Sequence, residues 1–274
     1  MVPLRTLRSL LSLADTCHSL YNSGHPIDEA TTVDQTLAPE HLPLSQTERI
    51  LDTFTAPSKT FTDLRRSTSW WLPFLIVALF SYLFTGVITQ KIGFTALAEH
   101  AMQQRAEETG QQIAPEAMAK GVSASATVFK VSFAASPLLY LISAALFSLL
   151  LWVGFNFLLG GRATYAGMFA VYLFGSLPSL IKTAITVAVV WFGNTENFDL
   201  QDPVGTNPGF YLGSDSAHWL KTFLSCFDIF TLWILFLVAL GGAILSEVKI
   251  RSGMILVFGA YAAFVLVRTA FAAF

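Results

Sequence analysis

The sequence predicts an all-α protein, a polytopic membrane helix bundle with five transmembrane helices, and three observations predict it. Of the 274 residues, 54% are hydrophobic and 12% are charged, and the mean hydropathy is +0.58, which is too apolar for an ordinary soluble domain. Five apolar stretches each approach the ~20 residues that an α-helix needs to cross ~30 Å of hydrocarbon. Tryptophans, which favour the boundary between hydrocarbon and water, stand at the ends of these stretches: Trp70, Trp71, Trp191 and Trp219.

The charge balance and the residue patterns exclude several classes of function. The net charge of -2 and the pI near 6.2 argue against a nucleic-acid partner, whose phosphates require clustered Lys and Arg. The two cysteines, Cys17 and Cys226, form neither a disulfide framework nor a thiolate metal site. No paired carboxylates, nucleophile motif or phosphate-binding glycine loop is present in the sequence. We therefore predict no catalytic residue, no cofactor and no metal, and we expect the partners to be the lipid bilayer and other membrane proteins or further copies of the chain.

Residues 1–44 are polar and contain no apolar run long enough to span a bilayer. Their content of Pro, Ser, Thr and Asp predicts a disordered or poorly ordered cytoplasmic tail. This composition is also compatible with a natural start of the protein downstream of the tail.

Residues 45–69 are predicted to form short cytoplasmic or interfacial helices. Ser45 and Glu48 have the spacing of a capping box, in which each side chain accepts a hydrogen bond from the backbone of the other residue. Pro57 interrupts this first helix. Phe61 and Leu64 then share one face just before the first apolar run, which predicts a helix that lies at the membrane interface.

Residues 70–274 are predicted to form the membrane domain. The five spans are expected at about residues 70–90, 133–159, 165–192, 223–246 and 253–274. Basic residues resist export, so Lys59, Arg65 and Arg66 predict a cytoplasmic N-terminus and, after five crossings, an external C-terminus. The loop before the fourth span is acidic, as an external loop permits, and it carries Glu196, Asp199, Asp202 and Asp215.

Three ionisable residues, Lys182, Asp228 and Arg268, fall inside the expected spans, where an unpaired charge costs several kcal/mol. All three lie toward the external side in the five-span arrangement. One interpretation is a buried polar cluster in which Asp228 neutralises Lys182 or Arg268. The other is that each cation extends to the interface while Asp228 lies at a helix N-terminus, where the helix dipole favours a carboxylate. A structural role is favoured over a transport site, because ion relays usually contain more than one intramembrane acid.

Small residues and one proline indicate close helix packing. Gly175, Pro178 and Lys182 recur at helical spacing, so the proline kink and the lysine share one face of the third span. Ala144, Ser148 and Gly241 are small enough to let helix backbones approach closely.

The predicted fourth span contains the string CFDIFTLWILFLVALGGAILS, which resembles the bacterial branch of the Yip domain family. In that family Asp-x-Phe-x-x-Trp is followed by Leu and Gly, and the matching residues here are Asp228, Phe230, Trp233, Leu237 and Gly241. The approach to the first span is similar to the start of the same family at Phe54, Pro57, Ser58, Lys59, Phe61, Trp70, Trp71 and Pro73. The run GSLPSL, with Gly175 and Pro178, is similar to the small-residue and proline stretch of its third span. The resemblance covers residues 46–274.

This resemblance implies a cytoplasmic N-terminus, a five-helix membrane domain and, in eukaryotic members, interaction with small GTPases in vesicle traffic or membrane shaping. The chain lacks the Asp-Leu-Tyr-Gly-Pro signature of those members before its first span, so a bacterial inner (plasma) membrane is the expected location. We therefore expect a non-enzymatic membrane protein that acts by partner or lipid interaction in membrane organisation or trafficking. The alternative is a small transporter or channel that uses the Lys182, Asp228 and Arg268 cluster.

Overall fold

The computed structural model describes residues 43–110, 113–193, 198, 200, 202–213 and 216–273. The chain divides into two units, Met1–Leu42 and Pro43–Phe274, and the described residues belong to the second. The predicted tail therefore lies outside the described residues except for positions 43 and 44. Glu196, Asp199 and Asp215 of the predicted acidic loop also lie outside them. The regular elements of the described part are all helices, in agreement with the predicted all-α fold.

Five helical segments are long and apolar enough to cross a membrane, and their order along the chain agrees with the sequence prediction. They are α4 (Trp71–Lys91), α7 with the π-helical turn η1 (Ser136–Leu158), α8 with α9 (Tyr165–Gly175 and Pro178–Phe192), α11 (Ile229–Ser246) and α12 (Ile250–Ala273). Pro178 is the first residue of α9. At this position its missing N–H removes no intrahelical hydrogen bond. The third span is therefore interrupted between α8 and α9 but continues across the proline.

The fourth span begins later than the sequence predicts. We expected it from residue 223, but α11 starts at Ile229, and residues His218–Ser225 form a separate short helix, α10. The apolar run continues across both helices, so hydropathy alone does not reveal the break. The helix is interrupted at Asp228, whose side chain caps the start of α11. An N-cap residue has a non-helical backbone, so the residues before it leave the axis of α11.

Two short helices precede the first span. In α2 (Gln46–Thr55) the predicted capping box is present: Glu48 N donates to Ser45 Oγ at 3.2 Å and Ser45 N donates to Glu48 Oε2 at 2.7 Å. The hydrogen bond from the Ser45 backbone lowers the pKa of the Glu48 carboxyl from its ordinary value. The second helix, α3 (Pro57–Leu64), turns Phe61 and Leu64 inward, and both side chains are fully buried. The apolar face of α3 therefore packs on the bundle rather than on lipid.

The centre of the bundle is α11. Half of α11 is buried, against 11% of the most apolar part of α12, and α3, α8, α9 and α12 all pack against it. One core cluster joins α3, α8 and α11 through Phe61, Phe174 and Leu237. A second joins η1, α8 and α11 through Phe155 and Met168. These apolar clusters occupy the interior along most of the length of α11.

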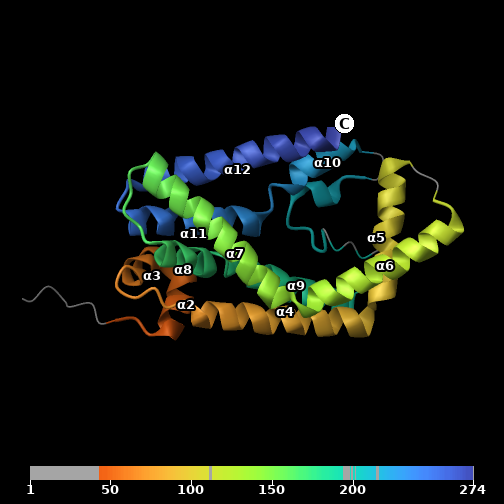
Figure 1. The fold of residues 1–274 in the computed structure, drawn as a ribbon, viewed down its shortest axis with the longest axis horizontal. Coiled ribbons are helices and arrows are strands. Elements are labelled where there is room, and N and C mark those ends of the chain that lie inside the picture. Colours follow the sequence, from red (N-terminus) through yellow and green to blue (C-terminus); the bar gives the residue numbers. More distant parts are fainter. Residues whose placement is uncertain are drawn as a thin grey trace, which may run out of the picture. The chain divides into compact units, whose positions relative to one another are not determined.

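The helices alternate in direction, so their connections gather at two ends of the bundle (Figure 1). At one end, which we call the Glu247 end, α2 and α3 lie beside α8, and Arg162 N donates to Ser246 O at 3.2 Å. At the other end, the Asp228 end, lie α5 (Phe94–Thr109), α6 (Pro115–Ala134) and α10. A third apolar cluster, which includes Ile88, Leu97 and Val190, holds the α5–α6 hairpin to α4 and α9.

Candidate functional site

The polar centre of the Asp228 end is built on the carboxylate of Asp228. Asp228 is the N-cap of α11, and its Oδ1 accepts from the Thr231 backbone N at 2.9 Å and from Thr231 Oγ1 at 3.2 Å. A carboxylate in this position satisfies one of the free N–H groups of the first turn and interacts favourably with the helix dipole. Both hydrogen bonds of Asp228 Oδ1 therefore come from a residue three positions later in the chain.

The other oxygen of Asp228 is held by residues distant in sequence. Lys182 Nζ, from α9, donates to Asp228 Oδ2 at 2.8 Å, and the hydroxyl of Thr206 donates to the same oxygen. The side chain of Asp228 is 6% exposed and that of Lys182 is 27% exposed. A buried carboxylate is tolerated only when its charge is paired and its lone pairs are occupied. Both conditions are met here.

Thr206 also fixes the segment that lies against the start of α11. Its carbonyl accepts from Ile229 N at 3.1 Å, in addition to the hydroxyl contact with Asp228. The next residue is Asn207, whose Oδ1 accepts from Phe210 N at 3.0 Å and so caps η2 (Pro208–Tyr211). The segment from Asp202 to Tyr211 is therefore anchored to the polar centre by both backbone and side-chain hydrogen bonds.

Arg268, the third residue of the predicted cluster, has a different neighbour. Its Nη1 lies 4.0 Å from the Sγ of Cys226, and among the described residues the salt bridge of Asp228 is to Lys182. Cys226 is held by α12 as well, because Tyr261 Oη donates to its carbonyl at 2.6 Å. The structure thus brings Lys182 and Asp228 into one ion pair and leaves Arg268 beside it on α12.

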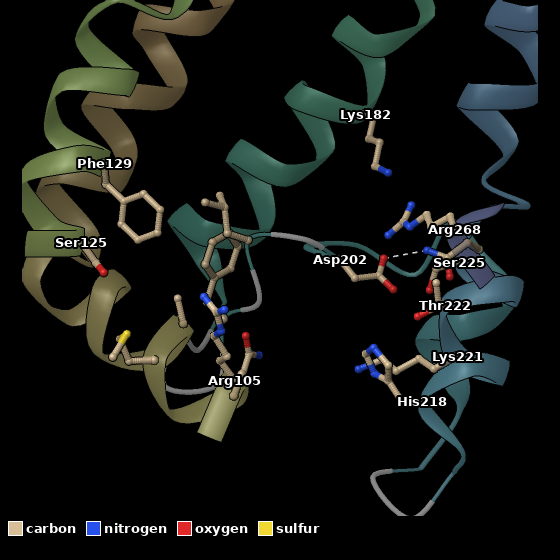
Figure 2. A pocket seen from close by; sticks show the side chains of 16 residues that line it. Arg105, Ser125, Phe129, Lys182, Asp202, His218, Lys221, Thr222, Ser225 and Arg268 are labelled. Carbon is tan, nitrogen blue, oxygen red and sulfur yellow. Dashed lines mark hydrogen bonds between the residues drawn. The ribbon is translucent and has the colours of Figure 1, made fainter. Parts of the chain in front are cut away.

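A cavity of about 560 Å³ opens next to this ion pair (Figure 2). Lys182 and Arg268 both line it. The remaining lining residues come from α5, α6, the segment after α9 and α10, and those with polar or charged side chains are Gln104, Arg105, Ser125, Asp202, Asn207, His218, Lys221, Thr222 and Ser225. Asp202 accepts from Asn207 Nδ2 at 2.6 Å, which is the dashed contact in Figure 2.

The two sequence segments that carry the family resemblance contact each other along α11. Phe54 of α2 packs edge-on against Trp233 of α11, with ring centroids 5.8 Å apart. Gly241 lies against Phe61, and a Cβ added at this glycine would come within 2.7 Å of the Phe61 ring. The segment before the first span and the motif of the fourth span are therefore two sides of one packing interface.

Comparison with known families agrees with this arrangement. The family model of the Yip1 domain matches residues 51–272. The chain belongs to the Yip1 domain family. No match was found among curated proteins, and none among solved structures.

The other motif residues occupy structural positions in this Yip1 domain. Pro57 and Pro178 are the first residues of α3 and α9. Pro73 is buried in the first turn of α4, next to the exposed Trp71. Gly175 approaches α11 so closely that an added Cβ would lie 2.8 Å from Val238 Cγ2. Phe230 stands in the first turn of α11, two residues after Asp228.

Sequence reasoning on this Yip1 domain did not find the cavity. Arg105, His218 and Lys221 belong to no motif that the sequence singles out, yet α5 and α10 bring all three side chains to the same cavity as Lys182. No local pattern predicts this, because the approach of α5 to α10 depends on how the α5–α6 hairpin packs on α4 and α9.

Proposed function

We propose that this protein is a non-enzymatic, multi-pass component of a bacterial inner membrane that acts through contacts with lipids or other membrane proteins in membrane organisation or trafficking. The membrane domain and the family are the basis of the proposal. The bacterial location is supported by the absence of the Asp-Leu-Tyr-Gly-Pro signature before the first span.

The main support for this proposal is that both carboxylate oxygens of Asp228 are already hydrogen-bonded within the protein. Its carboxylate is engaged by Lys182, Thr206 and Thr231 at once, which is the arrangement of a structural helix cap. A proton or ion relay needs further acids along a path, whereas the interior between Asp228 and Glu247 is occupied by the apolar clusters around Phe61 and Phe155. The arrangement favours a binding role over a small transporter or channel.

The charge distribution supports an orientation in which the Glu247 end is cytoplasmic. Basic residues stand at this end before α4, between η1 and α8, and around the start of α12: Lys59, Arg65, Arg66, Arg162, Lys249 and Arg251. Lys and Arg in short flanking segments oppose export across the membrane. The cavity and the C-terminus would then lie on the external side.

Flux measurements in proteoliposomes test this proposal against the transport alternative. Wild-type protein and the variant Asp228→Asn would be reconstituted with a pH-sensitive dye inside the vesicles and assayed for proton leak and for ion conductance. We expect both proteins to match protein-free vesicles. Flux through the wild type that Asp228→Asn abolishes, while circular dichroism shows that the variant is still folded at the assay temperature, would overturn the proposal in favour of a transporter.

A further inference from the structure

The cavity beside the Lys182–Asp228 ion pair has two chemically different walls. One is mostly apolar and includes Phe129 of α6 together with Phe198 and Leu200 from the segment after α9, all three of which belong to or pack on the cluster that anchors the α5–α6 hairpin. Ser125 and Arg105 lie on this same side of the cavity. The opposite wall carries Lys182 and Arg268. Figure 2 shows the ring of Phe129 on one side of the space and these two cations on the other. Such a cavity fits an amphipathic ligand.

Most of the charged side chains that line the cavity are cationic. Among the described residues that line the cavity there are four Lys or Arg side chains, Arg105, Lys182, Lys221 and Arg268, against a single carboxylate, Asp202. Lys182 is already paired with Asp228. Neither Lys221 nor Arg268 takes part in a salt bridge with a described residue. Two cations thus line the cavity without a salt bridge to a described residue, and the cationic side chains outnumber the single carboxylate, which favours an anionic ligand.

The hydroxyl groups and the volume of the cavity further restrict the chemical class of ligand that it fits. Thr222 and Ser225 stand on α10 one turn apart, next to Lys221, and both line the cavity. Lys, Arg and hydroxyl donors together are the usual partners of a phosphate group, because they supply both charge and directed hydrogen bonds. About 560 Å³ lies within the ~300–1,000 Å³ range of small-molecule sites, which is enough for a phosphorylated headgroup.

The depth of the cavity matches the headgroup zone of a bilayer. Arg268 stands in the last two turns of α12, and Lys182 pairs with Asp228, the residue that precedes α11. The cations therefore stand where two spanning helices begin or end. The bilayer places its phosphates at this level, just outside ~30 Å of hydrocarbon. A lipid phosphate could reach the cations while its glycerol and first methylenes contact the wall around Phe129.

We propose that this cavity binds a phosphate-bearing anion, and that the apolar wall favours the headgroup of an anionic phospholipid over free phosphate as its source. This inference deepens the proposed function, on which it rests, by naming the lipid class that the protein contacts and the residues that select it. Lys221 and Arg268 supply the selectivity. Lys182 mainly holds the cavity wall through its pair with Asp228.

Lipid retention in nanodiscs tests this assignment. The protein would be placed in nanodiscs of equal phosphatidylglycerol and phosphatidylcholine, released, and analysed by native mass spectrometry for the lipid that remains bound. We expect the wild type to retain phosphatidylglycerol preferentially. The double variant Lys221→Gln/Arg268→Gln should lower that preference about tenfold, which corresponds to ~1.4 kcal/mol. The reason is that phosphatidylcholine neutralises its phosphate with its own ammonium group, whereas the net negative charge of phosphatidylglycerol is attracted by the two cations.

Matched controls separate the cavity from general surface charge. Arg251→Gln removes an exposed cation from the other end of α12, and Lys120→Gln removes an exposed cation of α6 that does not line the cavity. Both should retain the wild-type preference, with unfolding temperatures that match those of the cavity variant. Equal loss of preference in the controls would overturn the assignment.

Inorganic phosphate distinguishes the two sources of the anion. If soluble phosphate is the source, millimolar phosphate should raise the unfolding temperature of the wild type in neutral detergent, but not that of the double variant, and nanodiscs should show no lipid preference. A wild type that neither prefers phosphatidylglycerol nor responds to phosphate would overturn the inference. Flux sensitive to Asp228→Asn would instead overturn the proposed function alone, since lipid retention is measured independently of flux.

Discussion

At the scale of single residues, Asp228 combines a local and a long-range task. Its Oδ1 caps α11, as any Asp, Asn or Ser at this position could do, whereas its Oδ2 binds Lys182 from another span. The two tasks can be separated by substitution, because asparagine retains the cap but loses the charge.

Asp228→Asn should therefore lower the free energy of unfolding in detergent by about 1–3 kcal/mol, since Lys182 loses its counter-ion while the N-cap is retained. The 27% exposure of Lys182 keeps the cost below that of a fully buried pair. Chemical denaturation of the single variants, Lys182→Met and the double variant gives the coupling energy. We expect about 1 kcal/mol or more, and a coupling energy of zero would contradict a stabilising ion pair.

Glu247 combines an unfavourable backbone conformation with a favourable side-chain contact. Its φ of 59° lies in the left-handed region, where glycine is favoured, and its carboxylate pairs with Arg65 on the surface. Glu247→Gly should raise the free energy of unfolding by about 0.5 kcal/mol, because relief of the strained φ exceeds the small value of an exposed pair. Glu247→Ala keeps the strain and loses the pair, so thermal unfolding should rank the three proteins Gly, Glu, Ala from most to least stable. The order Ala above Gly would contradict this account.

At the scale of elements, α3 packs as a wedge-shaped insertion against both α8 and α11. Phe61 and Leu64 are fully buried in the cluster that these helices share, and Arg49 of α2 holds Asp63 of α3 at 2.7 Å. The wedge requires a glycine opposite it, because Gly241 leaves the space that the Phe61 ring occupies. The two short helices are thus part of the folded membrane domain.

Gly241→Val should cost about 1–3 kcal/mol of stability, since the new side chain would overlap the buried Phe61 ring. It should also raise the rate at which a cysteine introduced at the buried Thr60 of α3 is labelled, because α3 is displaced. Combining it with Phe61→Ala should cost less than the sum of the two single changes. Gly259→Val is the matched control, as no atom lies within 4 Å of a Cβ there, and it should be near neutral. Additive effects of the first pair would contradict the direct contact.

At the scale of the whole molecule, five crossings place the two ends of the membrane domain on opposite sides of the bilayer. The described spans run from α4 to α12 with alternating direction, and the apolar surface that they expose is the surface that lipid would cover. The helices α5, α6 and α10, which contribute residues to the cavity, lie on the side of the C-terminus, away from α2 and α3 (Figure 1).

Reporter fusions should reveal that topology. We expect fusions after Lys59, Arg162 and Arg251 to report the cytoplasm, and fusions after Gln111, Thr206 and Phe274 to report the external side. Enzymatic reporters that are active on only one side of the membrane make the measurement. A cytoplasmic signal from Phe274 would mean an even number of crossings and would contradict the five-span bundle.

Much of this molecule follows from local sequence. Hydropathy predicted five spans because each stretch of about 20 apolar residues must leave water regardless of its neighbours. Short-range patterns likewise predicted the capping box at Ser45 and the break at Pro178. Features that depend on residues close together in the chain were therefore accessible without coordinates.

Tertiary structure decided what depends on residues far apart in the chain. It selected Lys182 rather than Arg268 as the partner of Asp228, set the start of the fourth span just after Asp228, and directed Phe61 into the bundle. It also brought Lys221 and Arg268 to one cavity. Hydropathy carries no information about which helix faces touch, because lipid and a neighbouring helix are equally apolar environments. The sequence by itself thus determined that this protein has five helices long and apolar enough to span a membrane, and only the packing of the helices determined where its charges meet.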